Sequence, residues 1–235
     1  MGSLMEARRR ILLNSPHVGT VSGGIASFKT DMDVPLKSLT ATGNIIRCGK
    51  NLVGTTIAAI KARNTGGTWS GNVYTATNGL TAELVLDSNG KLLGVMCSNT
   101  NSSGTRSFDI PISNDFVGKT LMMSGGIAGG KSGTYRLMLQ NFSPSAAVIA
   151  REYSGGSVKV VIPTGISDLR LRIAITGVYS NLYFRPMLTV EDETDQTYEV
   201  YTGDTYTAGQ TITALKGRNC IWSDSGNVTV KYWTH

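Results

Sequence analysis

The sequence predicts an all-β protein, built as a jelly-roll β-sandwich with a short N-terminal arm or helix and a small C-terminal β module. Only 16% of the 235 residues are charged, and 28 glycines help to separate short apolar runs. Such a composition is typical of many short strands joined by turns. About eight or nine apolar runs follow one another at fairly regular spacing, as in a two-sheet sandwich.

Three segments follow from the changes in composition. Residues 1–45 are predicted to form an N-terminal arm and attachment segment, residues 46–192 the jelly roll, and residues 193–235 the C-terminal β module. Residues 4–13 are rich in helix formers, and Asn14-Ser15-Pro16 ends that run. A helix this short needs packing to persist. It is either a frayed basic terminus or, as we expect, an arm that docks on a neighbouring subunit through Arg8, Arg9, Arg10, Ile11 and Leu12.

The first strands of the sandwich are marked by turn residues. Leu80–Leu86 and Lys91–Cys97 flank a turn that contains Asn89-Gly90, the strongest short hairpin signal. In Thr105–Ile112, alternate apolar residues predict a strand, and Pro111 places it at a sheet edge or at a strand end.

The later strands follow the same logic. Ala146–Tyr153 and Ser157–Ile162 surround Gly155-Gly156 and are predicted to form a second hairpin. Leucine and isoleucine then alternate with Arg170 and Arg172, which predicts a half-buried strand with a basic outer face. Leu182–Val190 follows as a further strand.

A polar connection and a short β module close the chain. Glu191, Asp192, Glu193 and Asp195 form the densest acidic cluster, but their spacing fits no EF-hand, so we expect a solvated linker and no metal site. The last strand carries large groups on both faces, which an isolated hairpin cannot bury. Trp222, Tyr232 and Trp233 are therefore expected to contact the sandwich or another copy of the chain.

A P-loop pattern occurs at residues 125–132. Gly125, Gly130, Lys131 and Ser132 match it, but a P-loop must open a helix. The residues that follow alternate as in a strand, so the segment is predicted to be a loop between two strands.

Several classes of function are disfavoured. Cys48, Cys97 and Cys220 are predicted to be free thiols of a reducing cytoplasm, and with only two histidines no metal or cofactor is expected. The net charge of +6 is not joined to a basic-aromatic cluster, so we expect no nucleic-acid partner, and no apolar stretch reaches membrane-spanning length.

An enzyme is not expected, because the sparse acidic residues of the sandwich lie mostly at predicted turns and not in a catalytic pair. A glycan-binding surface needs exposed aromatic rings together with polar groups. The candidates for such contacts are Trp69 and the pair Tyr179 and Asn181, the last two in a predicted loop. The alternative for each aromatic residue is a place in the core or in an interface, because aromatic residues routinely fill the cores of sandwiches.

Four stretches resemble one family. EARRRILLNSPH with FKTDMDVPLK, TWSGNVYTATNGLTAELVLDSNGKL, DLRLRIAITGVYSNLYFRPMLTVEDETDQTYEVYTG and TITALKGRNCIWSDSGNVTVKYW are similar to parts of minor tail or baseplate proteins of phages that infect Gram-positive, Firmicutes-type bacteria. The matches cover most of the chain. The chain departs from the family in one respect. Members of the family often have a longer stretch between the PLK element and the sandwich, whereas here only residues 38–47 separate the two.

The resemblance implies a virion component of tail, baseplate or fibre, synthesised and assembled in the host cytoplasm. Its implied partners are further copies of itself in a homotrimer, other virion proteins and host cell-surface polysaccharide, and it implies no catalytic residue. The alternative is a stand-alone carbohydrate-binding module without a virion role.

Overall fold

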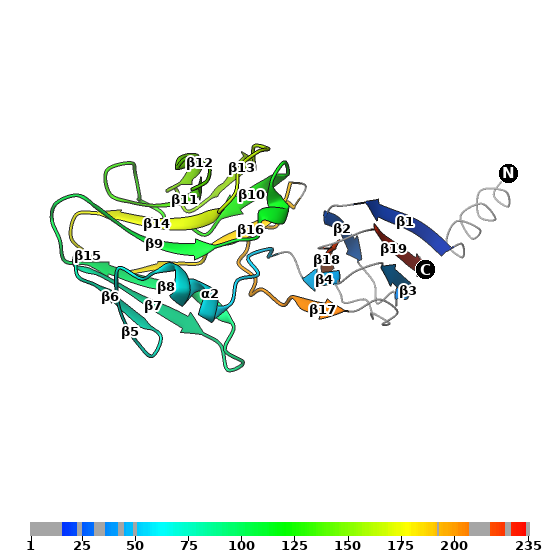
Figure 1. Cartoon of the computed structure of the whole chain (residues 1–235), viewed down its shortest axis with the longest axis horizontal. Helices are drawn as coiled ribbons and strands as arrows, with labels where there is room; N and C mark the ends of the chain where they lie inside the picture. Colours follow the sequence, from blue (N-terminus) through cyan, green and yellow to red (C-terminus); the bar gives the residue numbers. More distant parts are fainter. Residues whose placement is uncertain are drawn as a thin grey trace, which may run out of the picture. The chain divides into compact units, whose positions relative to one another are not determined.

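The computed structural model describes residues 51–191 and 193–203 in full and seven further strands by their backbone (Figure 1). The chain folds into two compact units. One unit is Asn51–Tyr201; the other joins Met1–Lys50 to Thr202–His235. Each unit is described by itself below.

The first layer of the Asn51–Tyr201 unit is a five-stranded antiparallel sheet in the order β15-β8-β7-β6-β5. Its hairpin β7–β8 is the one that Asn89-Gly90 predicts, and Gly90 takes the expected left-handed φ of 76°. The strands are β5 (Gly67–Ser70), β6 (Val73–Ala76), β7 (Leu80–Leu86), β8 (Leu92–Asn99) and β15 (Tyr179–Phe184).

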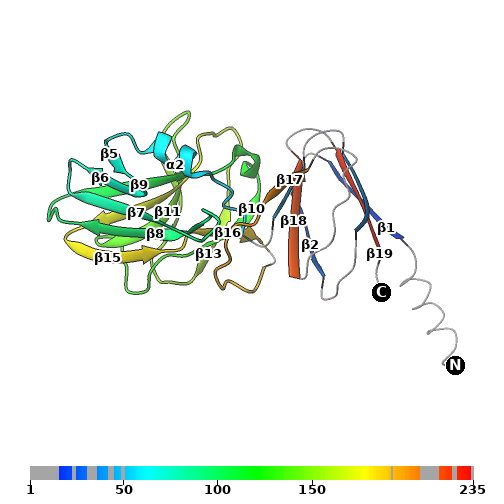
Figure 2. The ribbon, with the colours of Figure 1, turned by 90° about the horizontal axis from the view of Figure 1, so that it is seen from below.

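The second layer consists of a four-stranded sheet, β12-β11-β14-β9, and a three-stranded sheet, β13-β10-β16. Figures 1 and 2 show the four-stranded sheet lying over the five-stranded one. The strands are β9 (Thr105–Pro111), β10 (Thr120–Ser124), β11 (Tyr135–Asn141), β12 (Ala147–Glu152), β13 (Ser157–Val161), β14 (Arg170–Thr176) and β16 (Met187–Val190).

The core lies between the layers, where inward-facing residues from both sides are buried. Phe108 of β9, Leu137 of β11 and Ile173 of β14 are 0% exposed on one side, as are Val95 of β8 and Phe184 of β15 on the other. Burial of these side chains is the main favourable contribution to folding. The jelly-roll β-sandwich predicted from the sequence is confirmed.

A short helix, α2 (Ile57–Arg63), is an element that the sequence analysis does not predict. Thr56 caps its start by accepting a hydrogen bond from the Ala59 amide. At its end the Asn64 side chain donates to the Asp109 carbonyl at 2.8 Å and accepts from the Asp109 amide at 3.0 Å. Asn64 therefore covers the outer edge of β9, which Pro111 ends as predicted. A 3₁₀ turn at Asn114–Phe116 precedes β10.

The prediction of a second hairpin is wrong. Both strands exist, but β12 pairs with β11, and β13 pairs with β10 in the other sheet. Glu152 holds the chain in the conformation that leads away from β12. Its Oε1 accepts hydrogen bonds from the amides of Ser154 and Gly156, at 2.6 and 3.2 Å. Gly155-Gly156 thus marks a crossover between two sheets.

The glycine-rich segment after β10 is the loop that the sequence predicts. It joins β10 to β11, and strand β11 follows Lys131 where a P-loop would require a helix. Arg136 connects the loop to β11, because its NH1 donates a hydrogen bond to the Ser132 carbonyl at 2.5 Å.

The polypeptide enters and leaves the jelly roll at one place. The Asn51 side chain donates to the Glu199 carbonyl at 2.7 Å, although 148 positions separate the two residues. Gly54 lies against the Tyr201 ring so closely that an added Cβ would overlap it. The acidic connection that was predicted to be a solvated linker is only partly solvated. Glu191 forms an ion pair with Lys159 at the surface, but Glu193 is only 6% exposed.

The other unit contains two antiparallel sheets, in the orders β1-β19-β3 and β17-β4-β18-β2. Strands of the first 50 residues thus pair with strands of the last 34, which the sequence analysis treats as separate segments. The strands are β1 (Pro16–Ser22), β2 (Ile25–Thr30), β3 (Leu36–Ala41), β4 (Ile45–Cys48), β17 (Asp204–Tyr206), β18 (Gly217–Ser223) and β19 (Asn227–Trp233).

The predicted helix at residues 4–13 lies outside the described residues, and so do Arg8, Arg9, Arg10, Ile11 and Leu12. Within the described part of the chain, no helix has the length and apolar character needed to cross a membrane.

Candidate ligand-binding cavity

A cavity of about 260 Å³ opens where β10 ends and β13 begins. The backbone of β10 lies between β13 and β16 there, with Ser124 opposite Ser157 on one side and Met187 on the other. The bend between β15 and β16 and the connection after β16 supply the remaining walls.

Glycines let backbone segments approach one another closely in the wall of this cavity. Gly125 has a φ of 97°, and an added Cβ would overlap the carbonyl oxygen of Arg185. At Gly126 an added Cβ would overlap a carboxylate oxygen of Glu152. Both residues belong to the P-loop-like segment, which here forms a wall without its lysine.

Two tyrosines and one arginine also line the cavity. The Tyr183 hydroxyl donates to the Leu93 carbonyl at 3.2 Å, and the Tyr198 hydroxyl donates to the Leu92 carbonyl at 2.9 Å. The Arg185 guanidinium carbon lies 5.0 Å from the Tyr183 ring centroid and 5.7 Å from the Tyr198 ring centroid. Such contacts hold the two rings and the exposed guanidinium as one group.

Burial dominates the electrostatics of Tyr198. Loss of solvation, together with the neighbouring Tyr183, raises the pKa of the Tyr198 phenol to about 12, while the Arg185 cation opposes that shift. Tyr198 is therefore a neutral hydrogen-bond donor at neutral pH. Arg185 forms no ion pair with a carboxylate among the residues that the structure describes.

Three buried oxygens at this cavity receive no hydrogen bond from the described protein groups: Ser124 Oγ, Gln196 Oε1 and Glu152 Oε2. Ser124 and Gln196 line the cavity, and Glu152 lies against Gly126. The Gln196 amide nitrogen donates to Thr189 Oγ1 and to the Glu193 carbonyl, so its oxygen is left as an acceptor. An unsatisfied buried acceptor costs about 1–3 kcal/mol, and a ligand rich in hydroxyl groups would satisfy it.

The sequence-predicted pair Tyr179 and Asn181 lies elsewhere. Both residues are in β15 and not in a loop, because the strand register shifts between Tyr179 and Leu182 and Asn181 takes a φ of 56°. A bulge of this kind continues a strand through residues whose sequence reads as a turn. Asn181 is exposed, whereas Tyr179 packs edge-on against Tyr135 at 5.2 Å between centroids.

Trp69 lies on β5, at the opposite edge of the same sheet from Tyr179. Four strand spacings separate the two edges, or roughly 19 Å. The Trp69 ring packs on Tyr74 and Phe108, and its Nε1 donates to the Asn64 carbonyl at 3.1 Å. The three predicted glycan contacts therefore do not form one site, and none of them lines the cavity.

Sequence reasoning missed Ser124, Arg185, Gln196 and Tyr198. The one usable signal is the alternation of Tyr183 and Arg185, which sets a ring and a cation on neighbouring same-side positions of an extended chain. Trp222 lies on β18, and Tyr232 and Trp233 lie on β19; their side chains are outside the described part of the structure. Among the described residues, no group of three His, Cys, Asp or Glu side chains suits a metal ion.

No family model and no curated protein matches the chain. The solved structures with weak structural likeness include two of infectious bursal disease virus. The Gt strain chain is 11% identical, with 95% of this chain and 66% of that chain covered and a TM-score of 0.16. The Gx strain chain is 12% identical, with 94% and 65% covered and a TM-score of 0.16. The present chain thus spans about two thirds of their length, and both TM-scores are far below those of chains that share a fold.

Proposed function

We propose that this protein is a virion structural component of a phage of Gram-positive bacteria, in its tail, baseplate or fibre, and that its jelly roll binds a host-surface glycan. The observation that carries glycan binding is the gathering of Ser124 Oγ, Gln196 Oε1 and Glu152 Oε2 beside one cavity, without protein donors from the described residues. The virion role rests on the sequence resemblance.

A sugar ring fits the chemistry of this cavity. Its hydroxyls would donate hydrogen bonds to Ser124 and Gln196, and its C–H face would pack on the ring of Tyr183 or Tyr198. The volume lies just below the range of about 300–1,000 Å³ that is usual for drug-sized ligands. The proposed ligand is therefore a single terminal sugar unit and not a long segment of polysaccharide.

Binding is tested with the full chain on a glycan array and on purified cell-wall polysaccharide of the host. Tyr183→Ala should weaken binding at least tenfold. Tyr179→Ala is the matched control, since it removes a tyrosine that lies outside the cavity, and it should bind within twofold of the unchanged protein. No binding by the folded chain, or a loss with Tyr179→Ala alone, would refute the cavity as the glycan site.

The proposed assembly is a homotrimer that also contacts other virion proteins. Closed symmetric rings are the usual way for a chain to cover apolar surface that it cannot bury alone. Light scattering on the full chain should give three times the chain mass, and immunogold labelling should mark purified particles. A monomer that is absent from particles would support the alternative, a stand-alone carbohydrate-binding module.

A further inference from the structure

Arginines gather on the outer face of the four-stranded sheet, the face turned away from the core. The strand register sets Arg151 of β12 beside Met138 of β11, and Met138 beside Arg172 of β14. Arg136 precedes Met138 by two positions and so shares its face, and Arg170 precedes Arg172 in the same way. The predicted basic outer face of β14 thus extends over three strands.

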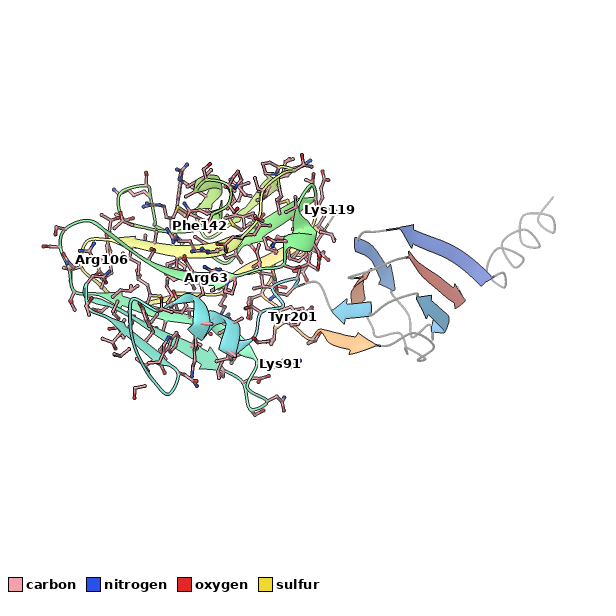
Figure 3. The ribbon with its side chains drawn as sticks, viewed as in Figure 1. Arg63, Lys91, Arg106, Lys119, Phe142 and Tyr201 are labelled. Carbon is pink, nitrogen blue, oxygen red and sulfur yellow. The ribbon has the colours of Figure 1, made fainter. Side chains whose placement is uncertain are left out.

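Two of these arginines are neutralised within the sheet. Arg172 contacts Asp109 through Nε and NH2, and Arg170 NH1 contacts the same carboxylate at 3.0 Å. Arg170 also pairs with Asp168, at 2.5 Å from NH2 to Oδ2. Both guanidiniums stack on the Phe142 ring, at 3.6 Å for Arg170 and 4.6 Å for Arg172, and Figure 3 labels that ring beside β14.

The other two arginines have no such partner. Neither Arg136 nor Arg151 forms an ion pair with a carboxylate among the described residues. Burial lowers the pKa of the Arg136 guanidinium, and the positive charge of Arg151 lowers it further. The fold therefore holds two like charges close together, at a cost in free energy that an anion between them would remove.

Polar groups on the same face favour a hydroxyl-bearing anion. Gln140 lies opposite Arg170, and its Oε1 is buried without a donor from the described residues. The hydroxyls of Thr105 and Thr176 lie 2.8 Å apart at the other end of β9 and β14. A nucleic acid fits less well, because the Phe142 ring on which a base would stack is already covered by Arg170.

We propose that this arginine face, centred on Arg136 and Arg151, is a second binding site, and that it takes an anionic polysaccharide. The acid groups of the polymer contact the two unpaired guanidiniums, and its hydroxyls contact the polar side chains along the sheet. The arginine face shares no residue with the cavity, so this proposal can be tested separately from the glycan site proposed above.

Dextran sulfate is the probe, with neutral dextran as its uncharged counterpart. Arg136→Gln with Arg151→Gln in the full chain should weaken dextran sulfate binding at least tenfold. Lys91→Gln with Lys119→Gln removes the same charge elsewhere on the jelly roll, at positions labelled in Figure 3, and should stay within twofold. Equal losses in the two double variants would overturn the proposal, because binding would then follow net charge alone.

Two further measurements keep the test decisive. Arg151→Gln alone changes an exposed side chain, should fold normally and should weaken binding at least threefold; unchanged binding would overturn the proposal. Tyr183→Ala should leave dextran sulfate binding intact even where it abolishes binding of the host glycan. Single-stranded DNA that binds as tightly as dextran sulfate, with the same dependence on Arg136 and Arg151, would identify the face as a nucleic-acid site and overturn the assignment to a polysaccharide.

Discussion

Arg172 meets Asp109 in a two-point contact, with Nε 2.6 Å from Oδ1 and NH2 2.8 Å from Oδ2. Arg170 adds a third hydrogen bond to the same carboxylate. Asp109 as a whole is 7% exposed and lies on β9, 63 positions before Arg172. This carboxylate joins the edge strand to the centre of the four-stranded sheet.

Removal of this carboxylate should destabilise the jelly roll. Asp109→Ala leaves two largely buried guanidiniums without their shared partner, and the free energy of unfolding should fall by about 3 kcal/mol. Urea denaturation followed by circular dichroism measures the change. Glu83→Gln, at an exposed position of β7, is the control and should stay within about 0.5 kcal/mol. Equal effects of both substitutions would contradict the role assigned to Asp109.

Stability should depend on acid pH through Asp168. The hydrogen bond from Arg170, with the charges of Arg170 and Arg63, holds the pKa of the Asp168 carboxyl below its ordinary value of 3.8, against the opposing effect of burial. The folded state therefore favours the carboxylate. Its contribution to stability is present above the unfolded pKa and is lost as the pH falls through the folded pKa. Asp168→Asn should lower stability at pH 6 and make less difference near pH 3, by urea denaturation at each pH. A difference that grows on acidification would refute this.

Tyr198 should ionise late and reduce stability in strong base. Its folded pKa of about 12 exceeds the ordinary 10.0, so its contribution is complete below pH 10 and is lost as the pH rises toward 12. Ultraviolet absorbance of phenolate should show a late-titrating component that Tyr198→Phe removes. A difference between the two titrations that is already complete below pH 10 would contradict the burial of this phenol.

The glycines of the cavity wall should resist substitution. Gly126→Ala would drive a methyl group into the Glu152 carboxylate, so it should lower stability by about 1–3 kcal/mol and weaken glycan binding. Gly133→Ala, in the same loop, meets no atom within 4 Å and should be tolerated. Thermal unfolding of both variants gives the comparison. A Gly126→Ala protein as stable as Gly133→Ala would show that the wall is not closely packed.

Two of the three cysteines should be able to form a disulfide. The backbone register sets Cys48 of β4 opposite Cys220 of β18. Opposed residues of antiparallel strands have α-carbons about 4.5–5.5 Å apart, a separation that a disulfide spans. With oxidised glutathione as the acceptor of two electrons and two protons, mass spectrometry should find one disulfide. Cys97 should stay reduced, because it is buried and burial raises the pKa of its thiol. A disulfide that includes Cys97 would contradict the burial of that thiol, and oxidation that leaves Cys48 and Cys220 unlinked would contradict the register.

Local patterns accounted for much of the fold. The alternation from Leu169 to Ile175 and the turn at Asn89-Gly90 are decided by neighbouring residues, and the structure has both. The crossover at Gly155-Gly156 was not predictable, because β13 pairs with β10, more than 30 positions away in the chain. Helix α2 was missed because seven residues give too short a period to recognise.

The cavity could not be read from the sequence for a related reason. Ser124, Gly155, Tyr183 and Tyr198 come from four separate segments, and only the packing of β10 against its neighbours brings them together. The basic face of β14 was visible as Arg170 and Arg172, but not the carboxylate of Asp109 that neutralises it. The packing of Trp69 against Tyr74 and Phe108 was not visible in the sequence, because an aromatic residue near a sheet edge has the same local pattern whether it packs inward or faces a ligand.

The hydrogen bond between the Asn51 side chain and the Glu199 carbonyl shows that the first and last residues of the jelly roll lie side by side. A domain whose two ends lie side by side can be replaced by another domain, since the replacement needs only to have its own ends at the same spacing. Under the proposed function, recombination at this junction would exchange the glycan-binding domain and redirect the particle to another host. The strands encoded on either side of the junction would be inherited unchanged.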